Sequence, residues 1–139
     1  MMELRERVLV DTNIIIQKRD MIFDFLKNYD PIFSDLIITE VMKVIRENAI
    51  ESKKKNKPEV ANKYLAFGQK FLKILYQQNT QLAYPDIKDF TDAFTLMFDR
   101  DVDAVDAVMA VIAKRQGVNV LSNDKDLDRL KDYTKRISI

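Results

Sequence analysis

Two spacings of hydrophobic residues alternate along the chain. Short blocks of branched apolar residues, bounded by polar ones, have the length and composition of buried β-strands. They occur at residues 8–10, 31–35, 81–85, 118–122 and 134–139. Between them, apolar residues recur every three or four positions, as on one face of a helix. This alternation predicts the α/β class: a three-layer α/β/α sandwich with a mostly parallel sheet of four to five strands.

The intervening segments predict helices of very different length. Residues 14–26 form one candidate, and residues 36–77 form a helical hairpin interrupted by the lysine-rich "SKKKNKPE". Further helices are expected after Asp86, over residues 104–116, and briefly within 123–133. With 139 residues, 47% of them hydrophobic, the chain suits one compact domain, so we expect a single domain over 1–139.

The composition limits which side chains could serve in catalysis or metal binding. The chain has no cysteine and no histidine, which excludes thiolate nucleophiles, histidine acid-base pairs and the usual zinc ligands. A net charge of +1 gives no global argument about nucleic acid. No apolar run approaches the length of a membrane span, and the charged start "MMELRER" is unlike a secretion signal. We therefore expect a cytoplasmic protein without membrane contact.

Acidic residues stand where predicted strands end. Asp11 follows the first strand and Asp124 the fourth, and the carboxyl ends of parallel strands meet at one edge of a sheet. Asp106 lies in the first turn of the most apolar helix, where an unpaired buried carboxylate is costly. Glu40 lies early in the helix after the second strand, which starts from the same edge. A competing interpretation is that Asp11 only caps the following helix.

Such a group of acids requires a cation. Two carboxylates about 5 Å apart repel by roughly 3 kcal/mol at an effective dielectric near 20. Oxygen ligands without histidine or cysteine favour Mg²⁺ or Mn²⁺. These ions activate water and stabilise phosphoryl oxygens, so the sequence predicts phosphodiester hydrolysis.

Three segments together carry a resemblance: "VLVDTN", "SDLIITEV" with Glu40, and "DVDAVDAVMAVIAKRQGVNVLSNDKDL". Their order and spacing resemble PIN-domain ribonucleases, most of all VapC-type toxins and related archaeal proteins. The resemblance covers nearly the whole chain. It implies a PIN-like fold and a Mg²⁺- or Mn²⁺-dependent endoribonuclease that acts as the toxin of a toxin-antitoxin pair. The catalytic and metal-binding acids of that family match Asp11, Glu40, Asp106 and Asp124.

The resemblance also implies supporting residues, each with a plain structural alternative. Asn13 and Ser122 match polar positions that bond the acids or metal-bound water, but they also suit a helix cap and a strand-end turn. Asp126 matches a fifth acid of some members, although with Asp128 it also suits a solvated helix face. Asp103 stands where the family often has Ser or Thr, and is a good helix cap.

Partners follow from the same resemblance. The hairpin at about 36–77 is similar to the protruding helices through which the toxins dimerise and hold an antitoxin, which implies a homodimer and a small antitoxin protein. The expected substrate is RNA. Lys18, Arg19 and Lys125 flank the acids and are candidates for RNA phosphate contacts.

Other functions fit less well. A dehalogenase-type phosphatase needs a second Asp two residues after Asp11, where Asn13 stands, and a receiver domain needs adjacent acids near the start. A dinucleotide-binding domain needs a glycine-rich loop, and the chain has two glycines. Two alternatives within the family stay open: an RNA-processing nuclease without a toxin role, and a non-catalytic binding scaffold.

Overall fold

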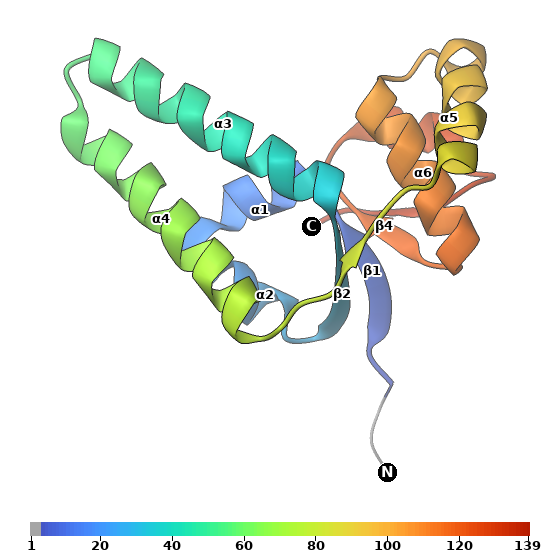
Figure 1. Cartoon of the computed structure of the whole chain (residues 1–139), viewed down its shortest axis with the longest axis horizontal. Coiled ribbons are helices and arrows are strands. Elements are labelled where there is room, and N and C mark those ends of the chain that lie inside the picture. The colour runs from blue at the N-terminus through green and yellow to red at the C-terminus, as the bar shows by residue number, and fades with distance from the viewer. Residues whose placement is uncertain (1–3) are drawn as a thin grey trace.

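The computed structural model describes residues 4–139, so the first residues of the charged N-terminal segment lie outside the described part. Its strands form a five-stranded sheet within that range, with the order β3-β2-β1-β4-β5 (Figure 1). Every neighbouring pair is parallel. The strands are β1 (Glu6–Val10), β2 (Tyr29–Ser34), β3 (Leu82–Ala83), β4 (Asn119–Leu121) and β5 (Arg136–Ile137). The predicted α/β class and parallel sheet are confirmed.

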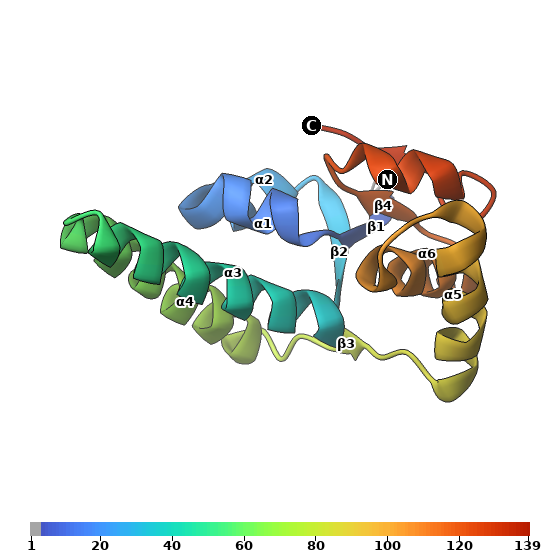
Figure 2. The same cartoon turned by 90° about the horizontal axis from the view of Figure 1, so that it is seen from above.

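Helices cover both faces of this sheet. They are α1 (Thr12–Lys18), α2 (Ile22–Leu26), α3 (Asp35–Lys54), α4 (Pro58–Gln77), α5 (Ile87–Arg100) and α6 (Ala104–Gln116). Two short 3-10 helices, η1 (Arg19–Met21) and η2 (Lys125–Leu130), complete the described chain. Figures 1 and 2 show α1 to α4 on one side of the sheet and α5 and α6 on the other.

The order in which strands are added to the sheet reverses between β1 and β4. The connections from β1 lead outward through β2 to β3, whereas β4 and β5 lie on the other side of β1. Loops that leave neighbouring strands toward opposite faces open a crevice at the carboxyl ends of those strands. The fold therefore places a crevice between the ends of β1 and β4, where Asp11 and Asp124 stand.

The core explains the strongly apolar segments. Val8, Leu9 and Val10 of β1 have no exposed surface, because both faces of the sheet are covered. In α6, all residues from Ala107 to Ala113 are buried, so this helix lies inside the molecule on nearly every side. Burial of large aliphatic side chains at about 25 cal/mol per Å² is the main stabilising contribution here.

The predicted single helix over residues 14–26 is wrong. Helix α1 ends at Lys18, and Arg19 adopts a positive φ of 45° while its N–H bonds to the Ile15 carbonyl. The chain then turns through η1 into α2. The hydrophobic spacing continues across this break, because both short helices bury apolar residues such as Ile15 and Ile22, so periodicity alone did not reveal the turn.

Other boundaries differ by a few residues. The second strand starts at Tyr29 and ends at Ser34, so Asp35 belongs to α3, since the Ser34 hydroxyl accepts a hydrogen bond from the Leu36 N–H and caps that helix. The short helix expected within 123–133 is the 3-10 helix η2. The outer strands β3 and β5 are two residues each, shorter than expected.

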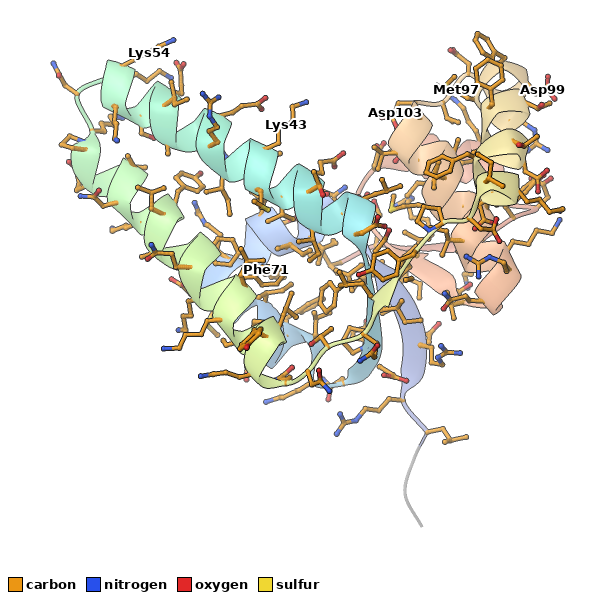
Figure 3. The ribbon with its side chains drawn as sticks, in the orientation of Figure 1. Lys43, Lys54, Phe71, Met97, Asp99 and Asp103 are labelled. Carbon is orange, nitrogen blue, oxygen red and sulfur yellow. The ribbon has the colours of Figure 1, made fainter. Side chains whose placement is uncertain are left out.

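Helices α3 and α4 form a long hairpin that projects from the sheet (Figure 2). Pro58 begins α4, where its missing N–H costs nothing. Phe71, labelled in Figure 3, fixes the base of the hairpin by packing against Phe23, Phe33 and Phe67 at ring distances of 5.6, 6.0 and 5.7 Å. Within residues 4–139, no helix is both long and apolar enough to cross a membrane.

Candidate active site

Asp11 is held at the end of β1 by a complete set of hydrogen bonds. Its Oδ1 accepts from the Thr12 N–H at 2.7 Å, so it does cap α1. Its Oδ2 accepts from the Ser122 hydroxyl at 2.6 Å and from the Asn13 amide at 3.0 Å. Capping and a functional role are therefore compatible, because the carboxylate is buried yet lines the crevice.

Ser122 and Asn13 join the ends of β1 and β4. The Ser122 Oγ accepts from the Asn13 amide at 3.1 Å and from the Asp124 N–H at 3.0 Å. The Asn13 Oδ1 in turn accepts from the Asn123 N–H at 3.0 Å. The two residues form a rigid polar link that fixes both Asp11 and the backbone that carries Asp124.

Asp106 lies in the first turn of α6 and reaches the same crevice. Asp103 caps this helix, since its Oδ1 accepts from the Asp106 N–H at 2.8 Å. The Asp106 side chain is buried, and its Oδ2 has no hydrogen-bond partner among the described residues. Figures 1 and 2 show the start of α6 as the part of its layer nearest to α3, which carries Glu40.

Asp124 and Asp126 complete the acidic group. Asp124 begins η2 by accepting from the Asp126 N–H at 2.9 Å. Carboxylate oxygens of Asp106, Asp124 and Asp126 all lie within 4.8 Å of one another. Asp126 also lies 3.6 Å from the guanidinium of Arg129, and Asp128 is paired with Arg136 at 2.9 Å. Of these two acids of η2, Asp126 shares the acidic cluster, whereas Asp128 is not part of it.

A pocket of about 430 Å³ collects these groups. Its polar lining comprises Asp11, Thr12, Asn13, Gln17, Glu40, Asp103, Asp106 and Asp124, and its apolar lining Ile16, Val44 and Val105. Glu40 is half-buried on α3, and Asp103 is exposed at the rim. The structure therefore brings together the four acids Asp11, Glu40, Asp106 and Asp124, as the sequence predicts.

The acids perturb one another strongly. Burial raises the pKa of Asp106 to about 8, and the nearby carboxylates of Asp103, Asp124 and Asp11 add to this. Burial also raises the pKa of Asp11, and the hydrogen bonds from Ser122 and Thr12 offset this only in part. Raised pKa values of several acids in one pocket are typical of functional sites, because such a concentration of charge does not favour stability.

The three basic residues predicted to contact RNA lie in different surroundings. Lys125 begins η2 directly after Asp124 and is exposed. The ammonium of Lys18 lies 4.7 Å from the Phe25 ring, and the guanidinium of Arg19 lies 5.1 Å from the Tyr64 ring. All three are outside the pocket lining.

The sequence interpretation missed Gln17 and Thr12 of the pocket. Gln17 lies one turn after Asn13 on α1, and its Oε1 accepts from the Asn123 amide at 2.7 Å. The spacing of four residues from Asn13 was the available signal, since such residues share a helix face. The Thr12 hydroxyl is buried without a hydrogen-bond partner among the described residues, and no sequence pattern indicated it.

The donor set fits a hard divalent cation. The pocket offers several carboxylates, and one buried carboxylate oxygen, Asp106 Oδ2, has no hydrogen-bond partner within residues 4–139, which is costly unless a proton or a cation is beside it. Oxygen-only ligands favour Mg²⁺ or Mn²⁺ over zinc or copper. Asp106, Asp124 and Asp126 have the spacing of a shared ion site.

The comparisons with known proteins agree with this geometry. A family model described as "PIN domain" matches residues 8–133, so the chain belongs to the PIN domain family. PIN domains are generally nucleases, and an acidic cluster of the expected kind is present. None of the curated proteins compared matches the sequence.

Several solved structures share the fold. PAE2754 from Pyrobaculum aerophilum has a TM-score of 0.62 at 14% identity, covering 98% of this chain and 92% of that one. VapBC2 from Rickettsia felis, bound to a DNA fragment from its promoter, has a TM-score of 0.55 at 14% identity, covering 95% and 98%. A toxin-antitoxin complex from Klebsiella pneumoniae reaches 0.50 at 15% identity, covering 85% and 87%.

Proposed function

We propose that this chain is a Mg²⁺- or Mn²⁺-dependent endoribonuclease that hydrolyses RNA phosphodiester bonds. The observation that carries the proposal is the convergence of Asp11, Glu40, Asp106 and Asp124 on one pocket, where a buried Asp106 oxygen finds no hydrogen-bond partner in the part of the chain that the structure describes. Membership of a family composed generally of nucleases supports it.

In this proposal Asp106, Asp124, Asp11 and Glu40 hold the cation, and Asp126 lies close enough to share it. The bound ion supplies Lewis-acid stabilisation of the phosphoryl oxygens and lowers the pKa of a water nucleophile. Ser122 and Asn13 keep Asp11 in one orientation through their bonds to its Oδ2. Lys125, Lys18 and Arg19 contact RNA phosphates around the pocket.

The scaffold alternative is disfavoured by energetics. A domain without catalysis gains nothing from a buried Asp106 whose pKa stands near 8, because that group lowers the stability of the metal-free protein at neutral pH. A bound cation would offset the cost of the buried Asp106 carboxylate, so this residue favours the metal-dependent nuclease over the scaffold.

The partners proposed are a second copy of the chain and a small antitoxin protein, with the protein acting as the toxin in the cytoplasm. Two of the neighbouring structures are toxin-antitoxin assemblies, which supports the second partner. An apolar groove of about 420 Å³ between α3 and α4, with Met42, Leu65 and Leu72 in its lining, offers such a protein a place on the hairpin. An RNA-processing role without antitoxin is the competing form of the same activity.

The chemistry is tested by the ends of the cleaved RNA. Water attack on the phosphate leaves ends without a 2′,3′-cyclic phosphate and tolerates a 2′-deoxy substitution at the cleaved bond. A contaminating metal-independent ribonuclease uses the 2′-hydroxyl as its nucleophile, so it does not cleave the 2′-deoxy substrate. Its cleavage of ordinary RNA continues in EDTA. Metal-dependent cleavage of the 2′-deoxy substrate supports the proposal, and cyclic phosphate ends contradict it.

A further inference from the structure

Positive charge is concentrated in one part of the chain. Residues 52–77, which cover the end of α3, the loop of the hairpin and α4, contain seven lysines and one glutamate. The rest of the chain contains 16 basic and 21 acidic residues. The net charge of +1 is therefore the sum of a basic arm, residues 52–77, and an acidic remainder. Lysines gathered on one element are typical of a surface that binds a polyanion.

The free end of the hairpin carries a small polar pocket of about 230 Å³, which we call the tip pocket. Its lining includes Asn48, Ser52, Lys55, Lys57 and Tyr64. It shares no lining residue with the apolar groove between α3 and α4 that is proposed above for an antitoxin. The tip pocket is therefore a separate surface of the same hairpin.

One face of α3 joins the acidic pocket to the tip pocket. Glu40 and Val44 line the acidic pocket, and Asn48, Ser52 and Lys55 line the tip pocket. Their spacing of three or four residues places them on one side of the helix. At 1.5 Å per residue, the distance along α3 from Glu40 to Lys55 is about 22 Å. On the order of five nucleotides of a single strand span such a distance.

Arg19 lies between the two pockets. It follows Gln17 of the acidic pocket by two residues, and its guanidinium lies 5.1 Å from the ring of Tyr64 in the tip pocket. Figures 1 and 2 show α1, which Arg19 follows, beside the hairpin and ending short of its tip. None of the ion pairs within residues 4–139 involves Arg19. The aromatic ring holds the guanidinium in place, while its N–H groups stay free to bind a phosphate.

Lys57 occupies a position where a lysine does not favour the fold. It is the N-cap of α4, and its side chain makes no capping hydrogen bond. Serine, threonine, aspartate and asparagine stabilise such a position, whereas a cation there is repelled by the helix dipole. Lys55, across the loop, is paired only with the exposed Glu51, at 3.4 Å. An anion bound in the tip pocket would offset the unfavourable charge of Lys57.

We propose that a single-stranded segment of RNA runs from the acidic pocket along α3 to the tip pocket, where Lys55 and Lys57 bind its phosphates, with Arg19 binding a phosphate between the two. Contacts to phosphates carry no sequence information, so this surface adds affinity and fixes the direction in which the strand leaves the acidic pocket. The inference rests on the nuclease proposed above. An acidic protein would also suit the lysines, but the continuous face of α3 between the pockets favours RNA.

Binding is tested with the full chain in EDTA, which prevents metal-dependent cleavage, and a fluorescent oligouridylate of about 12 nucleotides. The variants are Arg19→Ala and the double variant Lys55→Ala with Lys57→Ala. The matched control is Lys73→Ala, which removes an exposed lysine of the basic arm on the opposite side of α4 from Tyr64. At about 50 mM salt we expect about 10-fold weaker binding for the double variant, about 3-fold for Arg19→Ala and less than about 2-fold for Lys73→Ala. Circular dichroism checks that every variant is folded.

The salt dependence of binding tests for contacts to phosphate. Each phosphate contact with a single strand contributes about 0.7 to the slope of log K against log salt concentration, so this slope is expected to fall by about 1.4 in the double variant. Lys73→Ala is expected to keep the wild-type slope. Wild-type affinity and slope in the double variant would overturn the proposal. Displacement of the oligouridylate by poly-glutamate at equal charge would also overturn it, because the surface would then suit an acidic protein.

Cleavage kinetics test whether the tip pocket and the acidic pocket bind the same strand. With an RNA substrate of about 12 nucleotides in Mg²⁺, the double variant is expected to raise KM about 10-fold with little change in kcat, because the lost contacts are equal in the ground and transition states. This rise should disappear with a substrate of about four nucleotides, too short to reach the tip. An equal rise with both substrates would overturn the path along α3. Binding that depends on Lys55 and Lys57 in a chain that cleaves no RNA would contradict the nuclease proposal alone.

Discussion

Asp11 shows how one residue serves both the fold and the proposed chemistry. One oxygen caps α1 and the other accepts from Ser122 and Asn13, so both carboxylate oxygens are held by hydrogen bonds. The sequence placed Asp11 at the end of a strand and left open whether it capped a helix. The two interpretations were not exclusive, because a cap needs only one carboxylate oxygen.

Ser122→Ala tests the support given to Asp11. Loss of the 2.6 Å hydrogen bond is expected to lower metal affinity and RNA cleavage about 10- to 100-fold while reducing the free energy of unfolding by about 1 kcal/mol. Metal titration and cleavage kinetics check this. Ser138→Ala, at an exposed serine, is the control and is expected to change neither. Wild-type metal affinity and cleavage in Ser122→Ala would contradict the supporting role.

Asp106→Asn should separate stability from activity. The folded-state pKa of Asp106 is raised to about 8 from an ordinary 3.8, so its stabilising effect is complete below pH 4 and is lost as pH rises through 8. The variant lacks this dependence. In EDTA it is expected to be more stable than wild type by on the order of 2 kcal/mol at pH 8, and to lose cleavage in Mg²⁺.

Urea unfolding in EDTA at pH 5 and pH 8 measures this effect, with Asp20→Asn, at an exposed acid, as control. The gain in stability must be larger at pH 8. An equal gain at both values would show that Asp106 does not carry the expected charge penalty.

At the scale of elements, α5 and α6 are joined by Asp89. Its carboxylate accepts from the Asp86 N–H in a capping box and from Arg115 of α6. Burial alone would raise the pKa of Asp89, but these hydrogen bonds and the Arg115 charge outweigh it and hold that pKa below its usual value. Its stabilising effect is therefore present above about pH 4 and is lost as pH falls further.

Asp89→Ala is expected to reduce the free energy of unfolding by about 2 to 4 kcal/mol at pH 7, since it removes one of the two hydrogen bonds of the capping box and leaves Arg115 without its carboxylate partner. Chemical unfolding measures this, and Asp92→Ala, which removes only the exposed pair with Lys88, is expected to cost less than about 0.5 kcal/mol. The difference between the two variants should shrink below pH 4. A constant difference would contradict the charge-based explanation.

Prediction from sequence worked best for elements whose hydrophobic pattern matched their burial. The long helices and β1 follow their patterns closely, whereas the break at Arg19 was missed because α1 and α2 continue one apolar spacing across a residue of positive φ. Arginine gives no signal for that conformation, which glycine or asparagine more often adopts. The outer strands β3 and β5 were predicted too long. Their length depends on how many residues pair with β2 and β4, which are distant in sequence.

At the scale of the whole molecule, topology assembles the site. Asp11 and Ser122 lie 111 positions apart and meet because β1 and β4 are parallel neighbours at the point where the strand order of the sheet reverses. The sequence predicted that strand ends would share an edge, which was enough to gather Asp11, Glu40, Asp106 and Asp124. The sequence did not predict that Asp126 joins the acidic cluster while Asp128 pairs with Arg136, since that ion pair depends on the final packing of β5.

A cation at this site should stabilise the whole fold. Because it binds the folded chain and not the unfolded one, Mg²⁺ or Mn²⁺ at 100 times the dissociation constant adds about 2.7 kcal/mol to the free energy of unfolding. Thermal melts with and without metal are expected to show a clear rise in Tm for wild type and a smaller one for Asp124→Ala. Equal shifts would place the metal elsewhere.

Cleavage of RNA at the acidic pocket, as proposed above, should require both a bound cation and Asp11. Single-turnover cleavage of one labelled RNA by wild type and by Asp11→Asn, each in Mg²⁺, Mn²⁺ and EDTA, tests it most directly. We predict cleavage by wild type only with metal, and a rate at least about 100-fold lower for Asp11→Asn. Equal cleavage by both proteins, or cleavage that persists in EDTA, would show that the acidic pocket is not a metal-dependent nuclease site.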